Sequence, residues 1–129
     1  KSTGHSPPPI VPSFGPMRPN PINMIVKSGD ASMEDMIEDT KHGIFVTRFH
    51  YTNPVDPTRA ILTGLTRDGT FLIEDSELSK PVMNLRYTDS MLSALRNIEM
   101  LGKELERTGE CTTPAMKLQK LRFTGVTEY

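Results

Sequence analysis

The sequence contains a single cysteine, Cys111, so it cannot form an internal disulfide bond. It also lacks any apolar run as long as a membrane-spanning helix or the apolar part of a signal peptide. The simplest interpretation of these two absences is a chain that works in the reducing cytoplasm, with no membrane as partner.

An excess of basic charge is missing as well. The chain carries 15 Lys and Arg against 16 Asp and Glu, interspersed along the sequence, for a formal net charge of −1. Proteins that bind nucleic acids neutralise phosphates with clustered Lys and Arg. The charge balance therefore argues against nucleic acid as a partner.

Motifs of self-contained catalytic sites are absent too: there is no HExxH, Gly-rich phosphate loop, Ser-His-Asp arrangement or CxxC. The histidines, His5, His42 and His50, stand at no spacing that suggests a shared metal ion. His50, near the end of an expected strand, is more simply a hydrogen-bonded structural residue than a ligand. The chain by itself is therefore not expected to be an enzyme.

What the sequence does have is a proline-rich start. Residues 1–22 hold seven of the eleven prolines, and proline both fixes φ and lacks an N–H donor. This segment is expected to be either an extended arm or disordered, and composition leaves both open. Residues 23–129 have the length of one domain with a modest core. Because the chain starts with Lys1 and not Met, we expect it to be a fragment of a longer protein.

The strongest local pattern lies in residues 60–74, where an Asp-Gly pair separates two β-favouring apolar runs. Both residues accept positive φ, so the pattern predicts a β-hairpin with a two-residue turn at Asp68-Gly69. Both faces of this hairpin carry apolar residues. It is therefore expected in a sheet covered on both faces, or partly covered by a second subunit, most simply in a two-fold dimer.

The remaining elements follow from turn, capping and periodicity signals. They are a strand over Asn23–Lys27, a helix from a Ser32/Asp35 capping box to Gly43, a strand over Ile44–Tyr51 ended by a turn over 53–57, a turn at Asp75-Ser76, a strand over Glu77–Thr88 with Pro81 at its beginning or at an edge, a helix capped by Asp89 with an apolar stripe (Met91, Leu95, Ile98, Leu101, Leu105) that ends at Gly109, and a last strand over Ala115–Thr124 with a bulge at Gln119 or Lys120. The predicted fold class is α+β: a mainly antiparallel β-sheet, sandwich- or barrel-like, with two helices and an extended Pro-rich N-terminal arm.

Cys111 is the one conspicuous reactive side chain, and it is expected in a loop over residues 108–114. A loop cysteine on a rigid scaffold is suited to be a metal ligand or a nucleophile, but a single cysteine is also commonly an inert small residue. The residues alone favour the inert interpretation.

Five segments occur in a distinctive order: GIFVTRF from Gly43, TRDGTFLIE from Thr66, KPVMNLRYT from Lys80, NIEMLG from Asn97 and PAMKL from Pro114. In this order they resemble the C-terminal domain of the TldD/PmbA family. That family is often described as modulators of DNA gyrase and includes peptide-maturing zinc metalloproteases. The resemblance covers most of the chain.

This resemblance implies a catalytic zinc site shared with a domain upstream of Lys1. That domain is expected to carry a helix with an HExxxH motif, and the loop before the last strand is expected to supply a cysteine as third ligand. In this sequence the cysteine is Cys111. A His₂Cys set leaves the fourth zinc position open for water. Zinc is therefore expected as a cofactor only in the full-length protein.

Two functions follow from the resemblance. In the first, the chain is part of a cytoplasmic zinc metallopeptidase that acts on unfolded peptides, with its own N-terminal domain and a homo- or hetero-dimeric family member as partners. In the alternative, it is a non-catalytic assembly or dimerisation domain. Only Thr112 and Thr113 separate Cys111 from Pro114, a shorter segment than the resemblance implies for proteases, and this keeps the alternative open.

Overall fold

The computed structural model describes residues 23–109 and 111–126. The predicted arm, residues 1–22, lies outside this part of the chain. In chain order the elements are β1 (Met24–Ile25), α1 (Met33–Glu38), β2 (His42–Asp56), β3 (Ile61–Glu74), β4 (Glu77–Pro81), β5 (Leu85–Ser90), α2 (Met91–Arg96), β6 (Ile98–Thr108), β7 (Cys111–Leu118) and β8 (Phe123–Val126).

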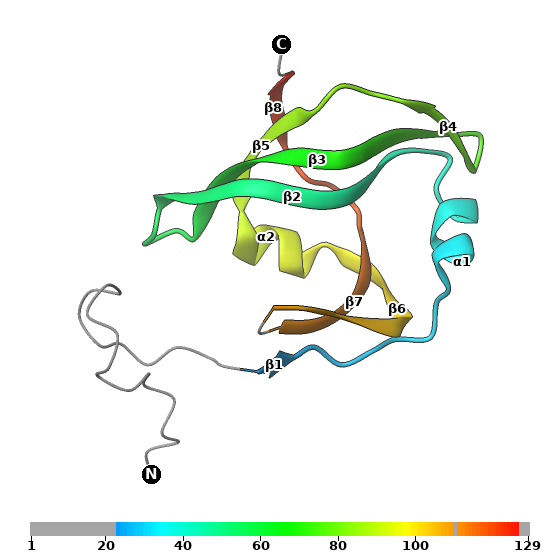
Figure 1. The fold of residues 1–129 in the computed structure, drawn as a ribbon, viewed down its shortest axis with the longest axis horizontal. Coiled ribbons are helices and arrows are strands. Elements are labelled where there is room, and N and C mark those ends of the chain that lie inside the picture. The colour runs from blue at the N-terminus through cyan, green and yellow to red at the C-terminus, as the bar shows by residue number, and fades with distance from the viewer. Residues whose placement is uncertain (1–22, 110, 127–129) are drawn as a thin grey trace.

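The strands form two sheets (Figure 1). Five strands make the larger sheet, in the order β2-β3-β5-β8 with β4 also paired to β3, and every pair in it is antiparallel. The smaller sheet has the order β1-β7-β6, and its β1–β7 pair is parallel. Helix α2 lies between the two sheets, and α1 lies at one end of the molecule near the β3–β4 turn. The α+β class with mainly antiparallel strands is confirmed, and the described strands form no closed barrel.

The predicted hairpin turn at Asp68-Gly69 is wrong, because β3 runs straight through these residues. Val46 pairs with Thr70 and Arg48 pairs with Arg67, so Thr47 alone faces the Asp-Gly pair. This is a β-bulge, which places one extra residue in a strand and accommodates positive φ just as a turn does. Asp68 has a φ of 62° and Gly69 a φ of 134°.

The turns lie on either side of this long strand. Residues 57–60 connect β2 to β3, so the turn predicted over 53–57 comes too early and its first residues belong to β2. The predicted turn at Asp75-Ser76 is confirmed. Both residues have positive φ, 52° and 66°, and Glu74 pairs with Glu77 across them, as in a type I′ hairpin turn.

The first helix begins as predicted and ends sooner. The Asp35 N–H donates to Ser32 Oγ at 3.0 Å, and the Ser32 N–H donates to Asp35 Oδ2 at 2.7 Å, which completes the capping box. These two hydrogen bonds lower the pKa of Asp35. The helix then stops at Glu38, so the predicted glycine cap at Gly43 is wrong. Gly43 lies in β2, where a Cβ would sit 2.6 Å from Cγ2 of Thr40.

The second helix is also shorter than predicted. It covers only Met91–Arg96, and the second half of the apolar stripe, including Leu101 and Leu105, belongs to strand β6. Leu101 pairs with Met116 of β7, so the strand's backbone groups are satisfied by the neighbouring strand and not within a helix. Asp89 does not cap the helix, whose N-cap is Ser90.

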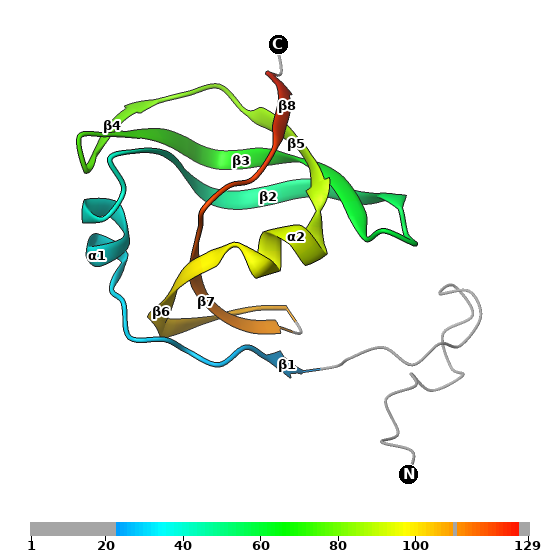
Figure 2. The same cartoon turned by 180° about the vertical axis from the view of Figure 1, so that it is seen from behind.

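Two predicted strands are each divided in the structure. The strand over Glu77–Thr88 is split into β4 and β5, and Pro81 lies in β4, an edge strand, as predicted. The last strand is split into β7 and β8, which belong to different sheets. Residues 119–122 cross from one sheet to the other, as Figure 2 shows. The predicted bulge is therefore a crossover.

The core that these elements enclose is small. Among the described residues its buried apolar members are Met36, Ile73, Tyr87 and Ala94. Tyr87 packs edge-on against Phe49, with ring centroids 4.9 Å apart, and its hydroxyl lies 2.8 Å from Thr52 Oγ1. Large apolar side chains remain exposed elsewhere. No helix in the described ranges is long and apolar enough to cross a membrane.

Candidate functional site

Cys111 is the first residue of β7 and does not lie in a loop, so that part of the prediction is wrong. Its backbone has a strand on each side: Cys111 pairs with Met24 of β1 in parallel and with Thr108 of β6 in antiparallel orientation. The next residue is held in the same way, because the Val26 N–H donates to the carbonyl of Thr112 at 2.9 Å. The sheet therefore fixes the backbone that presents the thiol, and the residue is half-buried.

The described part of the chain contains no group of three or more His, Cys, Asp or Glu side chains able to hold a metal ion. Three protein ligands are needed for a catalytic zinc ion, and one thiolate does not hold zinc against water. Cys111 thus fits the role of a single ligand in a site completed from elsewhere. It does not fit a site that this part of the chain would build alone.

The histidines are not brought to Cys111. His42 and His50 both lie in β2 of the larger sheet, whereas Cys111 lies in the smaller one, and His5 falls outside the described residues. The ring of His50 packs edge-on against Tyr51, with centroids 4.8 Å apart, and its buried Nδ1 has no hydrogen-bond partner within residues 23–109 and 111–126. His50 is therefore packed against a neighbouring ring, and the prediction that it is a hydrogen-bonded residue is wrong.

A lysine that sequence reasoning passed over ties α1 to the smaller sheet. Lys117 of β7 has a side chain only 14% exposed, and its Nζ lies 2.5 Å from Asp39 Oδ2 and 3.5 Å from Glu99 Oε2. The hydrogen bond to Asp39 is the main cause of a raised pKa for Lys117, which burial partly opposes. No local pattern marks this residue, because Asp39 stands far away in sequence.

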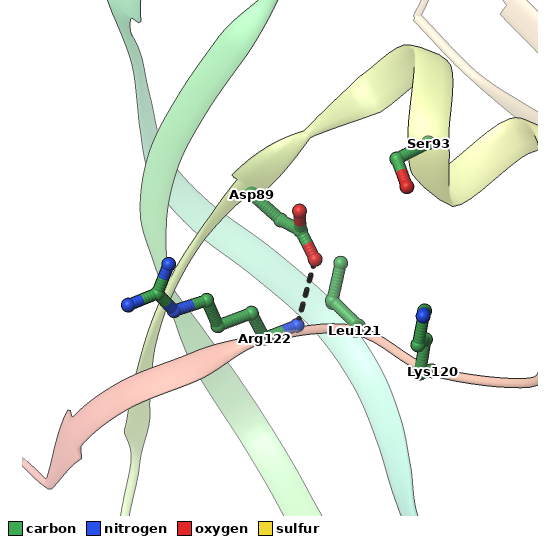
Figure 3. A pocket seen from close by; sticks show the side chains of 5 residues that line it. All are labelled: Asp89, Ser93, Lys120, Leu121 and Arg122. Atoms are coloured by element: carbon green, nitrogen blue, oxygen red, sulfur yellow. Dashed lines mark hydrogen bonds between the residues drawn. The ribbon is translucent and has the colours of Figure 1, made fainter.

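A pocket of about 340 Å³ lies beside the crossover between the sheets (Figure 3). Its lining comes from the end of β5, from α2 and from the crossover itself: Asp89, Ser93, Lys120, Leu121 and Arg122. Asp89, predicted to cap a helix, instead accepts hydrogen bonds from the backbone N–H groups of Ser90 at 2.7 Å and Arg122 at 2.9 Å. The pocket therefore brings together the Asp89 carboxylate, the Ser93 hydroxyl and the Lys120 side chain, while the Arg122 side chain points away from them in Figure 3.

Comparison with known proteins decides the family. A family model described as the PmbA/TldA metallopeptidase C-terminal domain matches residues 1–125. The chain belongs to this family. The resemblance to the TldD/PmbA C-terminal domain is thereby confirmed, and the PmbA/TldA domain accounts for nearly the whole chain.

Curated relatives agree with this assignment. The chain is 28% identical over 82 residues to a metalloprotease from Methanothermobacter thermautotrophicus, covering 64% of this chain and 18% of the relative. It is 25% identical over 118 residues to a zinc metalloprotease TldD homolog from Saccharolobus solfataricus, covering 80% of this chain and 25% of the relative. The chain thus spans a quarter or less of the length of these two relatives.

Solved structures show the same fold. TldE from Thermococcus kodakarensis superimposes with a TM-score of 0.77 at 20% identity, covering 97% of this chain and 28% of that one. A protein described as a proposed modulator of a DNA gyrase from Thermotoga maritima gives a TM-score of 0.65 at 13% identity, covering 78% and 23%. At these identities the likeness concerns the fold of the PmbA/TldA C-terminal domain.

Proposed function

We propose that this domain completes the catalytic zinc site of a cytoplasmic PmbA/TldA metallopeptidase that cleaves unfolded peptides. The observation that carries the proposal is the family match across residues 1–125. A domain upstream of this chain supplies two histidines from an HExxxH helix, and Cys111 supplies the third ligand. The name of the Saccharolobus solfataricus relative, a zinc metalloprotease, supports the choice of metal.

The structure suits Cys111 to this role through its backbone. Strands on both sides hold residues 111 and 112, so the position of the thiolate is set by a sheet and not by a flexible loop. A ligand held in this way loses little conformational entropy when it binds. Bound at a His₂Cys site, zinc supplies a Lewis acid and an activated water.

The substrate we propose is a peptide in extended conformation. Strands β2 and β8 lie at the two ends of the β2-β3-β5-β8 order, so within the described residues each has one unpaired edge. An unpaired edge offers backbone N–H and C=O groups that can pair with an extended chain irrespective of its sequence. Such pairing favours unfolded peptides over folded proteins. The arm over residues 1–22 is proposed as a further contact for the peptide.

The partners we propose are the upstream domain and a second family member, identical or different. Apolar side chains support this proposal, because Tyr51, Leu92 and Leu95 are 70%, 55% and 57% exposed while the buried apolar core is small. These three side chains are the proposed contact positions for such partners. The same observation favours the second candidate function, a non-catalytic assembly or dimerisation domain of the family.

The test compares full-length wild type with Cys111→Ser. Serine is nearly isosteric with cysteine and a far poorer zinc ligand, so we expect the variant to lose bound zinc and peptide cleavage while its circular dichroism, which reports the fold, stays unchanged. Thr112→Ser, one residue along the same strand, is the matched control and keeps both properties. Full zinc content and activity in Cys111→Ser would contradict the ligand role. A wild type that binds no zinc and cleaves nothing would place the protein in a non-catalytic branch of the family.

A further inference from the structure

The pocket beside the crossover is distinct from the proposed zinc site, since Cys111 does not line it. Its volume of about 340 Å³ lies at the lower end of the roughly 300–1,000 Å³ found for small-molecule sites. A metabolite of few atoms fits this size.

The walls of the pocket are fixed by backbone hydrogen bonds. At one end of the crossover, the Gln119 N–H donates to the carbonyl of Asn97 at 2.8 Å. At the other end, the Arg122 N–H donates to Asp89 Oδ2 at 2.9 Å, and the Arg122 carbonyl accepts from the Thr88 N–H at 3.0 Å. The backbone of the crossover and the Asp89 carboxylate are therefore held in place before a ligand binds.

The charges around the pocket are not paired with one another. Asp89 and Lys120 both line it but form no ion pair, and neither Lys120 nor Arg122 pairs with a carboxylate elsewhere in the described residues. The Asp89 carboxylate accepts one backbone hydrogen bond on each oxygen. A carboxylate has about four acceptor positions, so each oxygen can accept one more bond.

The arrangement separates the two signs of charge across an apolar surface. In Figure 3, Leu121 lies between Asp89 on one side and Lys120 on the other, with Ser93 on the same side as Lys120. A ligand that carries both a cationic and an anionic group matches both side chains, whereas a ligand with a single charge matches only one of them.

We propose that this pocket binds a free α-amino acid with an apolar side chain. Its ammonium group donates to the Asp89 carboxylate, its carboxylate accepts from Lys120 Nζ and Ser93 Oγ, and its side chain packs on Leu121. The two charges of the ligand then neutralise two side chains that have no ion-pair partner in the described part of the chain. The proposal goes beyond peptide cleavage and does not depend on a zinc ligand at Cys111.

The test is calorimetric titration of the full-length protein with L-leucine. We expect saturable binding, weakened about tenfold or more by Lys120→Gln, because a hydrogen bond between charged groups contributes about 1.5–3 kcal/mol and 1.4 kcal/mol is tenfold. Lys80→Gln removes the same charge from an exposed residue of β4 and is the matched control, expected to bind as wild type does. Ser93→Ala is expected to weaken binding to a smaller extent.

Two single-charge analogues complete the design. Isocaproate is leucine without its ammonium group, and isoamylamine is leucine without its carboxylate. If the pocket binds both the ammonium and the carboxylate of leucine, each analogue is expected to bind at least about tenfold more weakly than leucine. This follows from the same free energy for a hydrogen bond between charged groups. No saturable leucine binding, binding that Lys120→Gln leaves unchanged, or equal binding of isocaproate would overturn the proposal. Cys111→Ser should still bind leucine, so failure of the zinc site and failure of this pocket are distinguishable.

Discussion

The ammonium of Lys117, on β7, donates to the carboxylate of Asp39, the C-cap residue of α1. The Nζ atom lies 2.5 Å from Asp39 Oδ2 and 3.0 Å from the Asp39 carbonyl oxygen. Glu99 of β6 lies at 3.5 Å from the same ammonium. One side chain thus joins a helix and two strands. A charged group only 14% exposed is well placed to contribute to stability, whereas the 65% exposed Asp39 limits the gain by leaving it partly solvated.

We expect Lys117→Met to lower the free energy of unfolding by about 1–2 kcal/mol, since a hydrogen bond to a charged group is lost and the Asp39 carboxylate loses its partner. Urea unfolding of the two proteins measures the difference. Lys80→Met, which removes an exposed lysine with no ion pair in the described residues, is the matched control and should change stability little. Equal effects of the two substitutions would contradict the prediction.

The contact between Lys117 and Asp39 also makes the free energy of unfolding depend on pH in the alkaline range. The pKa of Lys117 is raised in the folded protein, first by its hydrogen bond to Asp39. The folded state therefore holds this proton more tightly than the unfolded state, whose lysine pKa is about 10.4. The stabilisation from the Lys117–Asp39 contact is complete below the pKa of the unfolded state. It is lost as pH rises through the higher pKa of the folded state. Lys117→Met should abolish this part of the alkaline decline.

The bulge in β3 gives the third prediction. Gly69→Val places a β-branched residue at a φ of 134° and brings its Cβ to 3.0 Å from Cε2 of Phe71, so we expect a loss of about 1–3 kcal/mol. Gly125→Val is the matched control, because a Cβ at Gly125 meets nothing within 4 Å and its φ is not positive. Thermal unfolding measures both, and a Gly69→Val protein as stable as Gly125→Val would show the reasoning wrong.

The fourth prediction concerns the pairing that holds Cys111. Val26→Pro removes the N–H that donates to the Thr112 carbonyl, and proline cannot replace that donor. We expect faster reaction of the Cys111 thiol with a soluble disulfide reagent, because β1 no longer covers that edge of β7. Val26→Ala keeps the N–H and is the control. Identical thiol reaction rates in the two variants would mean that β1 does not restrain this strand.

The features that could be predicted from sequence depend on a few neighbouring residues. The Ser32/Asp35 capping box and the Asp75-Ser76 turn are set by local hydrogen bonds and local φ values, and both were correct. The edge position of Pro81 follows from its missing donor. The α+β class also follows, because it needs only the types of element present.

The errors concern features that distant residues decide. The positive φ at Asp68-Gly69 is right, but a bulge and a turn share that conformation, and pairing with β2 along the whole of β3 selects the bulge. Likewise, Leu101 and Leu105 repeat at helical spacing, yet pairing with β7 makes them part of a strand. Tertiary pairing overrides a local pattern in both cases.

The candidate sites divide in the same way. The metal-ligand role of Cys111, which rests on a single residue and a resemblance, stays a prediction, and the place of Cys111 at the start of a strand was not predicted. The sequence did not predict the pocket, because Asp89 and Lys120 are far apart in sequence. They line the same pocket only because the crossover between the sheets brings their segments together. No spacing rule connects them. An aspartate just before a helix is normally interpreted as its N-cap, so the sequence gives no sign that Asp89 accepts a hydrogen bond from the Arg122 N–H.

The parallel pairing of β1 with β7 bears on the order in which the molecule assembles. Strands β2, β3 and β4 pair with their neighbours along the chain, so closing those loops costs little conformational entropy. Met24 reaches Cys111 only across most of the sequence. During synthesis, which proceeds from the N-terminus, the meander can form while β7 is still inside the ribosome. The β1–β7 pair, which holds the backbone of Cys111, therefore closes after the β2-β3-β4 meander, and the cysteine lacks its β1 neighbour until then.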